Sequence, residues 1–212
     1  MNVLALDAAS PEPGVCLLAR GQVFEEALPA DRHASEKLLS TIARCLDRAG
    51  MALSECDRIA VCSGPGSFTG LRVGLSTAWG LGRALEIPLE SVSTLEGLAE
   101  AARAGGGDCV TAVVDAGRGE VVIESFSLEG QRARSLSPPR RVSREAAAAA
   151  TGPLVCLPRD LLGPRDLAPA TSVSRAVCLA VAGDPREGVV AGDSLRAVYS
   201  RPSAAEEKRG AP

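Results

Sequence analysis

Aromatic residues are scarce in this chain of 212 residues, which holds three phenylalanines, one tryptophan and one tyrosine. The hydrophobic core must therefore be built from Leu, Val, Ala and Ile. Apolar residues make up 46% of the chain and charged residues 23%, a balance typical of a soluble globular protein. A chain of this length can form one or two small domains with a substantial core.

The chain also lacks a basic surplus, paired cysteines and a leader-like N-terminus. Its net charge is −3, so we expect any contact with nucleic acid to be local or made through a partner. The seven cysteines contain no Cys-x-x-Cys pair, which favours reduced core residues in a cytoplasmic protein. No basic region precedes the first apolar run, which Asp7 interrupts, so we expect neither a signal peptide nor a membrane span.

Histidine occurs once, as His33. A metal site seeded by a His-x-x-x-His pair is therefore excluded, and no motif supports a Cys–His nucleophile pair. We interpret His33 as a helix-start residue, because Ser35 and Glu36 beside it are common near helix N-termini. The sequence predicts no metal and no cofactor.

Hydrophobic periodicity predicts an α/β protein in which helices cover a mixed sheet. Thr94 is expected to cap the helix that begins at residue 95. The expected strands are 3–6, 14–20, 22–30, 58–62, 88–91, 109–114, 120–127 and 154–157, and the expected helices are 34–48, a helix from the glycine-rich segment to about 86, 95–103 and 173–181.

A short repeated pattern in the sequence indicates two related halves. Leu4–Ala8 and Ala112–Ala116 both read as a strand, an aspartate and a small residue, each followed by a β-hairpin. Gly105–Gly107 is the clearest linker between them. We therefore predict subdomains at 1–104 and 108–201, followed by a disordered charged tail at 202–212.

The most informative segment is Gly64–Gly74, which reads GPGSFTGLRVG and joins a strand to a helix. Ser67 and Thr69 are natural N-cap residues. A Walker loop is excluded because Gly70 is followed by Leu and Arg, and the segment follows the wrong strand for a dinucleotide-binding fingerprint. Anion binding by the loop backbone, with contacts from Ser67 and Thr69, stays open as an alternative.

Small residues recur every four positions in the helix that follows this loop. Glycine inside a helix costs about 1 kcal/mol relative to alanine, so the stripe indicates the close approach of another backbone. Two interpretations are open: the stripe packs on the chain's own sheet, or it forms a helix-to-helix subunit interface anchored by the tryptophan. The predicted partner-binding residues are Gly70, Leu71, Gly74, Leu75, Ala78, Trp79 and Gly82.

Two other groups of residues allow a functional and a structural interpretation. Asp7 and Asp115 each end a strand, where they could contact a nucleotide and its Mg²⁺ or simply cap a turn; we favour the turn caps. Arginines crowd the stretch 131–144, which has no acidic residue and could meet RNA phosphates. It lacks aromatics for base stacking, so a solvated loop is favoured. These arginines are Arg132, Arg134, Arg140, Arg141 and Arg144.

Four segments together resemble the TsaB (YeaZ) family: Leu4–Asp7, Gly64–Gly74, Val92–Leu95 and Val114–Val121. The segment 197–201, AVYSR, is similar to the closing element of that family, with Ala or Val where proline is expected. The match covers nearly the whole chain and is strongest in residues 1–125.

The resemblance implies an actin-like ATPase (ribonuclease H-like) fold with two related subdomains, whose mixed sheets are flanked by helices. It implies a non-catalytic scaffold in the complex that adds threonylcarbamoyl to N6 of the adenosine beside the anticodon, in tRNAs reading codons that start with A. The implied partners are a TsaD-like catalytic subunit and a TsaE-like ATPase, with a homodimer through the same helical face. The tRNA would be met only through the complex.

Two alternatives of other classes remain. The chain could be a stand-alone ATP-binding phosphotransferase or hydrolase of the actin-like fold that uses Asp7, Asp115 and the glycine loop. It could also bind tRNA directly through the arginines of 131–144. We expect no catalytic residue, because a metal-binding histidine pair and a clear adenine-binding element are missing from the sequence.

Overall fold

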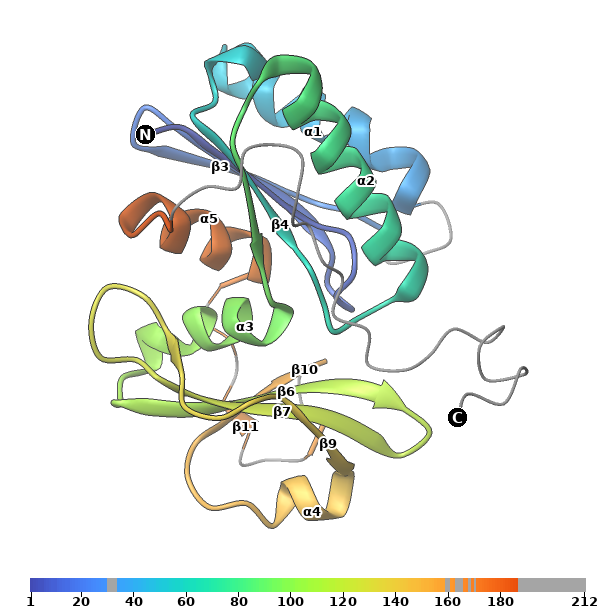
Figure 1. Ribbon diagram of the computed structural model, residues 1–212, viewed down its shortest axis with the longest axis vertical. Coiled ribbons are helices and arrows are strands. Elements are labelled where there is room, and N and C mark those ends of the chain that lie inside the picture. Colours follow the sequence, from blue (N-terminus) through green and yellow to red (C-terminus); the bar gives the residue numbers. More distant parts are fainter. Residues whose placement is uncertain (30–33, 159–160, 163–165, 168, 170, 187–212) are drawn as a thin grey trace.

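The computed structural model describes residues 1–29, 34–158, 161–162, 166–167, 169 and 171–186 of the chain. It contains two β-sheets, one above the other in Figure 1, with helices between them and on both outer sides. The expected α/β class with mixed sheets flanked by helices is confirmed.

The first sheet has five strands in the order β3-β2-β1-β4-β5. β1 is its centre: it pairs antiparallel with β2 and parallel with β4, and all five of its residues are buried. A strand covered on both faces carries apolar residues without alternation, as this one does up to its final aspartate. The strands are β1 (Val3–Asp7), β2 (Gly14–Ala19), β3 (Gln22–Ala27), β4 (Arg58–Cys62) and β5 (Leu89–Val92).

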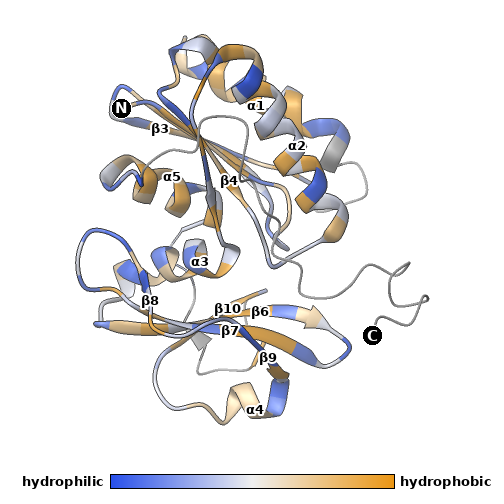
Figure 2. Cartoon of the chain, viewed as in Figure 1, coloured by the Kyte–Doolittle hydropathy of each residue, from blue (hydrophilic) through white to orange (hydrophobic). Residues whose placement is uncertain are grey.

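Helices α1 (Ala34–Ala49) and α2 (Phe68–Leu85) cover one face of the first sheet. The other face is covered by α5 (Val173–Gly183), which contacts β1, β2 and β4. Figure 2 shows α5 as largely apolar, as expected for a helix packed between layers. Among the described residues, no helix has the length and apolar character needed to span a bilayer.

The second sheet repeats the plan of the first, with β6 antiparallel to β7 and parallel to β10. β8 and β9 both pair with β7, at different points along it. The short helix α4 (Arg144–Ala148) packs on its outer face, against β7 and β9. The strands are β6 (Cys109–Gly117), β7 (Glu120–Ser127), β8 (Arg134–Ser135), β9 (Arg140–Ser143), β10 (Leu154–Leu157) and β11 (Asp166–Leu167).

Helix α3 (Thr94–Ala102) follows the first sheet in sequence but packs on the second, against β6, β7 and β10. α5 follows the second sheet and packs on the first, so the two helices exchange sheets and meet between them (Figure 1). They meet closely, because a Cβ on Gly97 would lie 2.8 Å from side-chain carbons of Val173 and Val177. The subdomain division at 104 and 108 remains a prediction, and the tail 202–212 lies outside the described residues.

Most expected elements are confirmed, and one cap is corrected. α3 begins at Thr94, and the Ser93 hydroxyl accepts a hydrogen bond from the Glu96 amide at 2.9 Å, so Ser93 is the N-cap. The Thr94 hydroxyl is buried without a partner. β8, β9, β11 and α4 were not expected from the sequence, nor were two short 3-10 turns at Leu53–Glu55 and Arg103–Gly105.

Candidate functional site: the glycine loop, helix α2 and the arginines

The glycine loop is packed against the end of β1 and leaves no room for side chains. The Ser67 amide donates to the Ala9 carbonyl at 2.8 Å, and the Ser67 hydroxyl accepts from the Gly70 amide at 3.2 Å, which makes Ser67 the N-cap of α2. A Cβ on Gly70 would lie 1.9 Å from the Ala8 carbonyl oxygen. Backbone contact of this kind explains why the loop needs glycine.

The small-residue stripe of α2 faces the chain's own sheet. A Cβ on Gly74 would lie 3.7 Å from Val61 of β4, and one on Gly82 would lie 2.4 Å from the Leu89 side chain of β5. Leu71 and Ala78 are fully buried beside them. Of the two interpretations, packing on the chain's own sheet is therefore the one the structure shows.

This orientation corrects the set of predicted partner-binding residues. Four of these residues are buried within the chain: Leu71, Gly74, Ala78 and Gly82. Gly70 lies against Ala8 and Ala9 in the loop that follows β1, here called the β1 loop. These five residues therefore pack inside the chain and are not available to a partner. Leu75 is half-buried against the core beneath α1 and α2, and Trp79 is 49% exposed. Only Trp79 presents a large surface outward, so any partner contact by this helix must use its other face.

The outer face of α2 is formed by Arg72 and by the residues four, seven, eight and eleven positions after it. The indole of Trp79 lies at its centre, and a Cβ on Gly80 would meet nothing within 4 Å. The Arg72 guanidinium lies over the Phe68 ring, with its central carbon 4.0 Å from the ring centroid. The sequence signal for this face was the spacing of polar and small residues opposite the glycine stripe. The exposed residues are Arg72, Ser76, Trp79, Gly80 and Arg83.

The candidate anion contacts are hydrogen-bonded as turn residues. Asp7 Oδ1 accepts from the Ala9 and Ser10 amides, both at 3.0 Å, and Asp115 Oδ1 accepts from the Gly117 amide at 2.9 Å. Burial raises the pKa of Asp7, and hydrogen bonds from Ser10 and Ala9 oppose this only in part. Asp7 is fully buried, so a nucleotide could reach it only if the loop opened. Ser67 is committed to its cap, and Thr69 is exposed.

The five arginines of 131–144 do not form one patch. Arg132 is buried, with only 3% of its side chain exposed. Arg144 pairs with Asp115 at 3.0 Å. Arg134, Arg140 and Arg141 are exposed on β8 and β9.

Arg132 belongs to a buried ionic network that joins the two sheets. Its guanidinium pairs with Glu90 of β5 and, at 2.8 Å, with Glu96 of α3. Burial lowers the pKa of Arg132, but the two carboxylates outweigh this and leave the pKa raised, so the residue stays charged. Its Nη1 also donates to the Asp184 carbonyl, just after α5.

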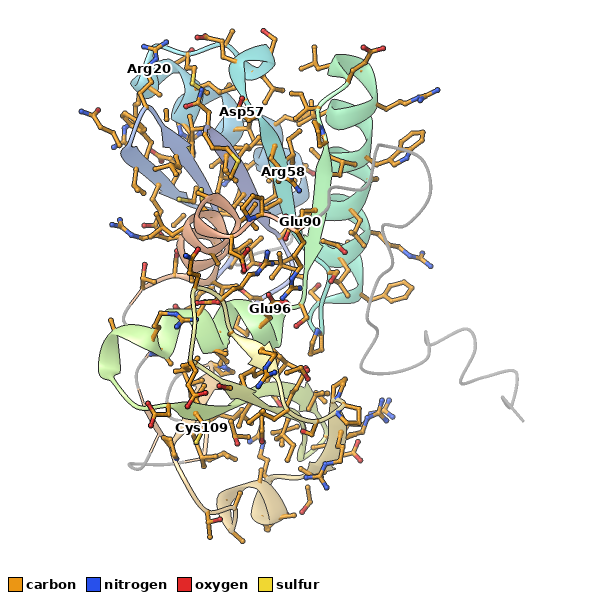
Figure 3. All side chains as sticks on the ribbon, turned by 60° about the vertical axis from the view of Figure 1, so that its left-hand side comes forward. Arg20, Asp57, Arg58, Glu90, Glu96 and Cys109 are labelled. Atoms are coloured by element: carbon orange, nitrogen blue, oxygen red, sulfur yellow. The ribbon has the colours of Figure 1, made fainter. Side chains whose placement is uncertain are left out.

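Two further arginines extend this network: Arg58 pairs with Glu90 at 3.1 Å and Arg186 with Glu96 at 2.8 Å. A separate pair, Arg103 with Glu100 at 2.8 Å, lies at the end of α3. Figure 3 shows Arg58, Glu90 and Glu96 following one another from the first sheet toward α3. No sequence signal could identify these residues together, since they come from segments spread between positions 58 and 186.

Cysteines and acidic residues show no further site in the part of the chain that the structure describes. All seven cysteines are free thiols, and all but Cys109 are buried. Burial raises the pKa of Cys45 to about 11 and that of Cys56 to about 12, which keeps both thiols protonated and unreactive. Among the described residues, no group of three metal-ligating side chains occurs. His33 and the 197–201 element lie outside the described residues.

A family model described as "TsaD: tRNA N6-adenosine threonylcarbamoyltransferase" matches residues 28–150. The tRNA threonylcarbamoyladenosine biosynthesis protein TsaB of Escherichia coli (strain K12) is 36% identical over 122 residues, which are 57% of this chain and 53% of that protein. Its counterpart in Haemophilus influenzae is 34% identical over 133 residues, 62% of this chain and 56% of that protein. The chain thus spans about half the length of the curated relatives it matches.

Solved structures extend the similarity over nearly the whole chain. YeaZ from Pseudomonas aeruginosa superimposes with a TM-score of 0.78 at 29% identity, covering 93% of this chain and 99% of that one. A second structure, described as similar to peptidase YEAZ from Pseudomonas aeruginosa, has a TM-score of 0.77 at 30% identity and covers 94% of this chain and 99% of that one.

Two mixed sheets with exchanged helices define an actin-like (ribonuclease H-like) α/β protein. Within this class, the chain belongs to the TsaD-type family and, in it, to the TsaB (YeaZ) group. The resemblance seen in the sequence is confirmed.

Proposed function

We propose that the chain is a non-catalytic scaffold subunit of the complex that adds threonylcarbamoyl to N6 of the adenosine beside the anticodon, in tRNAs reading codons that start with A. Membership of the TsaB group supports a role in tRNA threonylcarbamoyladenosine biosynthesis, because the curated relatives of the chain are named for that process. The proposed partners are a TsaD-like catalytic subunit and a TsaE-like ATPase, in the cytoplasm.

The outer face of α2 carries the proposal of partner binding. Trp79 is half exposed on a rigid helix, between Arg72 and Arg83, and Trp and Arg are among the residues most enriched at interface hot spots. Ser76 and Gly80 leave a shallow surface beside the indole, where another helix can approach. A second copy of the chain would use the same face and would compete with the catalytic subunit.

The proposal that the chain is not itself an enzyme rests on the glycine loop. The Ser67 and Gly70 amides, which a phosphate would need, are bonded to Ala9 and to the Ser67 hydroxyl. Asp7 is buried beneath the loop. We expect calorimetry of the isolated chain with ATP and Mg²⁺ to show no binding, whereas micromolar binding would favour the stand-alone phosphotransferase.

Truncating Trp79 to alanine is expected to weaken binding of the TsaD-like subunit by about 30-fold, which corresponds to about 2 kcal/mol. Gly80→Arg should have a similar or larger effect, because it fills the surface beside the indole, while its open surroundings leave the fold intact. Binding can be measured by calorimetry or by co-purification of the two subunits.

Leu136→Ala is the matched control, because Leu136 is also exposed (55%) but lies beside the second sheet, away from α2. It should bind the catalytic subunit as the unaltered chain does. If both α2 variants still form the complex fully, α2 is not part of the interface.

A further inference from the structure

Three arginines of the second sheet have no ion-pair partner among the described residues. Two arginines at other places in the fold do have one: Arg20 pairs with Glu55 at 3.1 Å and Arg175 with Glu25 at 3.7 Å. Arg134, Arg140 and Arg141 are exposed, and none of them has a salt bridge or a side-chain hydrogen bond within the described residues. Their charges are therefore available to a ligand.

The three arginines lie along one edge of the sheet. β8 and β9 pair with the same strand, β7, so that Arg134 lies opposite Ser127 and Arg141 opposite Val122. At about 3.4 Å per residue, this stretch of β7 is about 17 Å long. Because successive residues of a strand point to opposite faces of the sheet, Arg140 and Arg141 project to opposite sides of this edge. We call these three residues the arginine edge.

We propose that the arginine edge binds the phosphate backbone of an RNA. This inference rests on the proposed function, in which the RNA is the tRNA that the complex modifies. It departs from the expectation that the tRNA is met only through the complex, because the chain itself would contact the RNA. Guanidinium groups bind phosphate oxygens in pairs of hydrogen bonds, and a stretch of about 17 Å can meet several phosphates of one strand. No aromatic residue occurs between 131 and 144, so the edge contacts the backbone and does not stack on bases.

The surroundings of the arginine edge favour a polyanion over a protein strand. Residues 131–144 include no acidic side chain, so nothing within the segment neutralises the three charges. Pro138 and Pro139 lie between β8 and β9 and lack the amides that an added strand would need. The flanking Arg132 and Arg144 are engaged with carboxylates and cannot contribute.

The test is the salt dependence of binding of the full-length chain to an unmodified tRNA transcript, between about 50 and 200 mM salt. Removing one arginine–phosphate interaction should reduce the slope of log affinity against log salt by about 0.7 to 0.9. We expect the variant R134Q/R140Q/R141Q to reduce this slope by about two to three units.

A matched variant, R20Q/R44Q/R175Q, changes the net charge equally but removes arginines that have carboxylate partners. It should retain the original slope. The proposal is overturned if both variants reduce the slope equally, if the unaltered chain does not bind the transcript, or if phosphatidylserine vesicles compete for the chain as well as the transcript does.

Co-purification with the TsaD-like subunit separates this proposal from the proposed function. The R134Q/R140Q/R141Q variant should bind that subunit normally, because the arginine edge and α2 lie on different sheets. A reduced slope in a chain that never binds the subunit would refute the scaffold role alone. Intact subunit binding with an unchanged slope would refute the arginine edge alone.

Discussion

Replacing Arg132 by methionine is expected to lower the free energy of unfolding by about 3 kcal/mol, which is a drop of about 6 to 12 °C in Tm for a chain of this length. Methionine fills most of the volume of the arginine side chain but cannot neutralise the buried carboxylates of Glu90 and Glu96. It also loses the hydrogen bond to the Asp184 carbonyl. Chemical denaturation and thermal unfolding measure both quantities.

The remaining arginines decide the size of this effect. Removing one partner of a buried ion pair costs about 3 to 5 kcal/mol when the other charge is left unpaired. Here each carboxylate keeps one arginine: Glu90 keeps Arg58 and Glu96 keeps Arg186. The lower end of the range is therefore expected.

Two comparisons test whether charge is the cause. Arg20→Met breaks the exposed pair with Glu55 and should leave the free energy of unfolding nearly unchanged, because water screens a pair at the surface. In a double-mutant cycle, Arg132→Met should cost less in the Glu96→Gln background than alone, because the carboxylate it leaves behind is gone. Equal costs in both backgrounds would mean that the pair between Arg132 and Glu96 contributes nothing to the loss.

The network shows what the sequence could not predict. The sequence groups five arginines in 131–144, a stretch without acidic residues, but the structure separates them. Arg132 pairs with carboxylates on β5 and α3, Arg144 pairs with Asp115 of β6, and the other three are exposed. Only the exchange of α3 and α5 between the sheets brings Arg132 to Glu96. Such long-range pairing has no local signal in a single sequence.

The central strands and long helices were predictable because apolar residues recur in them with a clear period. β8, β9 and α4 were missed because they have two to five residues, too few for a period to show. The stripe of α2 was ambiguous for another reason: small residues permit a close approach from either a sheet or a partner helix. Its orientation depends on the β1 loop, which lies far away in sequence.

Gly70→Ala is expected to destabilise the chain by roughly 3 kcal/mol, at the upper end of the cost of overpacking. The added carbon would lie 1.9 Å from the Ala8 carbonyl oxygen and 2.8 Å from its carbon, which are backbone atoms and cannot rotate away. Either the β1 loop or the start of α2 must shift, and a shift disturbs the Ser67 cap and its bond to Ala9. Thermal unfolding of the variant measures the loss.

Gly80→Ala is the matched control in the same helix, and it should have the opposite sign. Nothing lies within 4 Å of a Cβ at this position, and alanine in a helix interior is favoured over glycine by about 1 kcal/mol. The two variants distinguish a glycine that a close backbone contact requires from one that no contact requires. If Gly70→Ala were also neutral or stabilising, the close contact with the β1 loop would not exist in solution. A loss confined to Gly70 would show that this glycine holds α2 against the first sheet, which fixes the face that Trp79 presents outward.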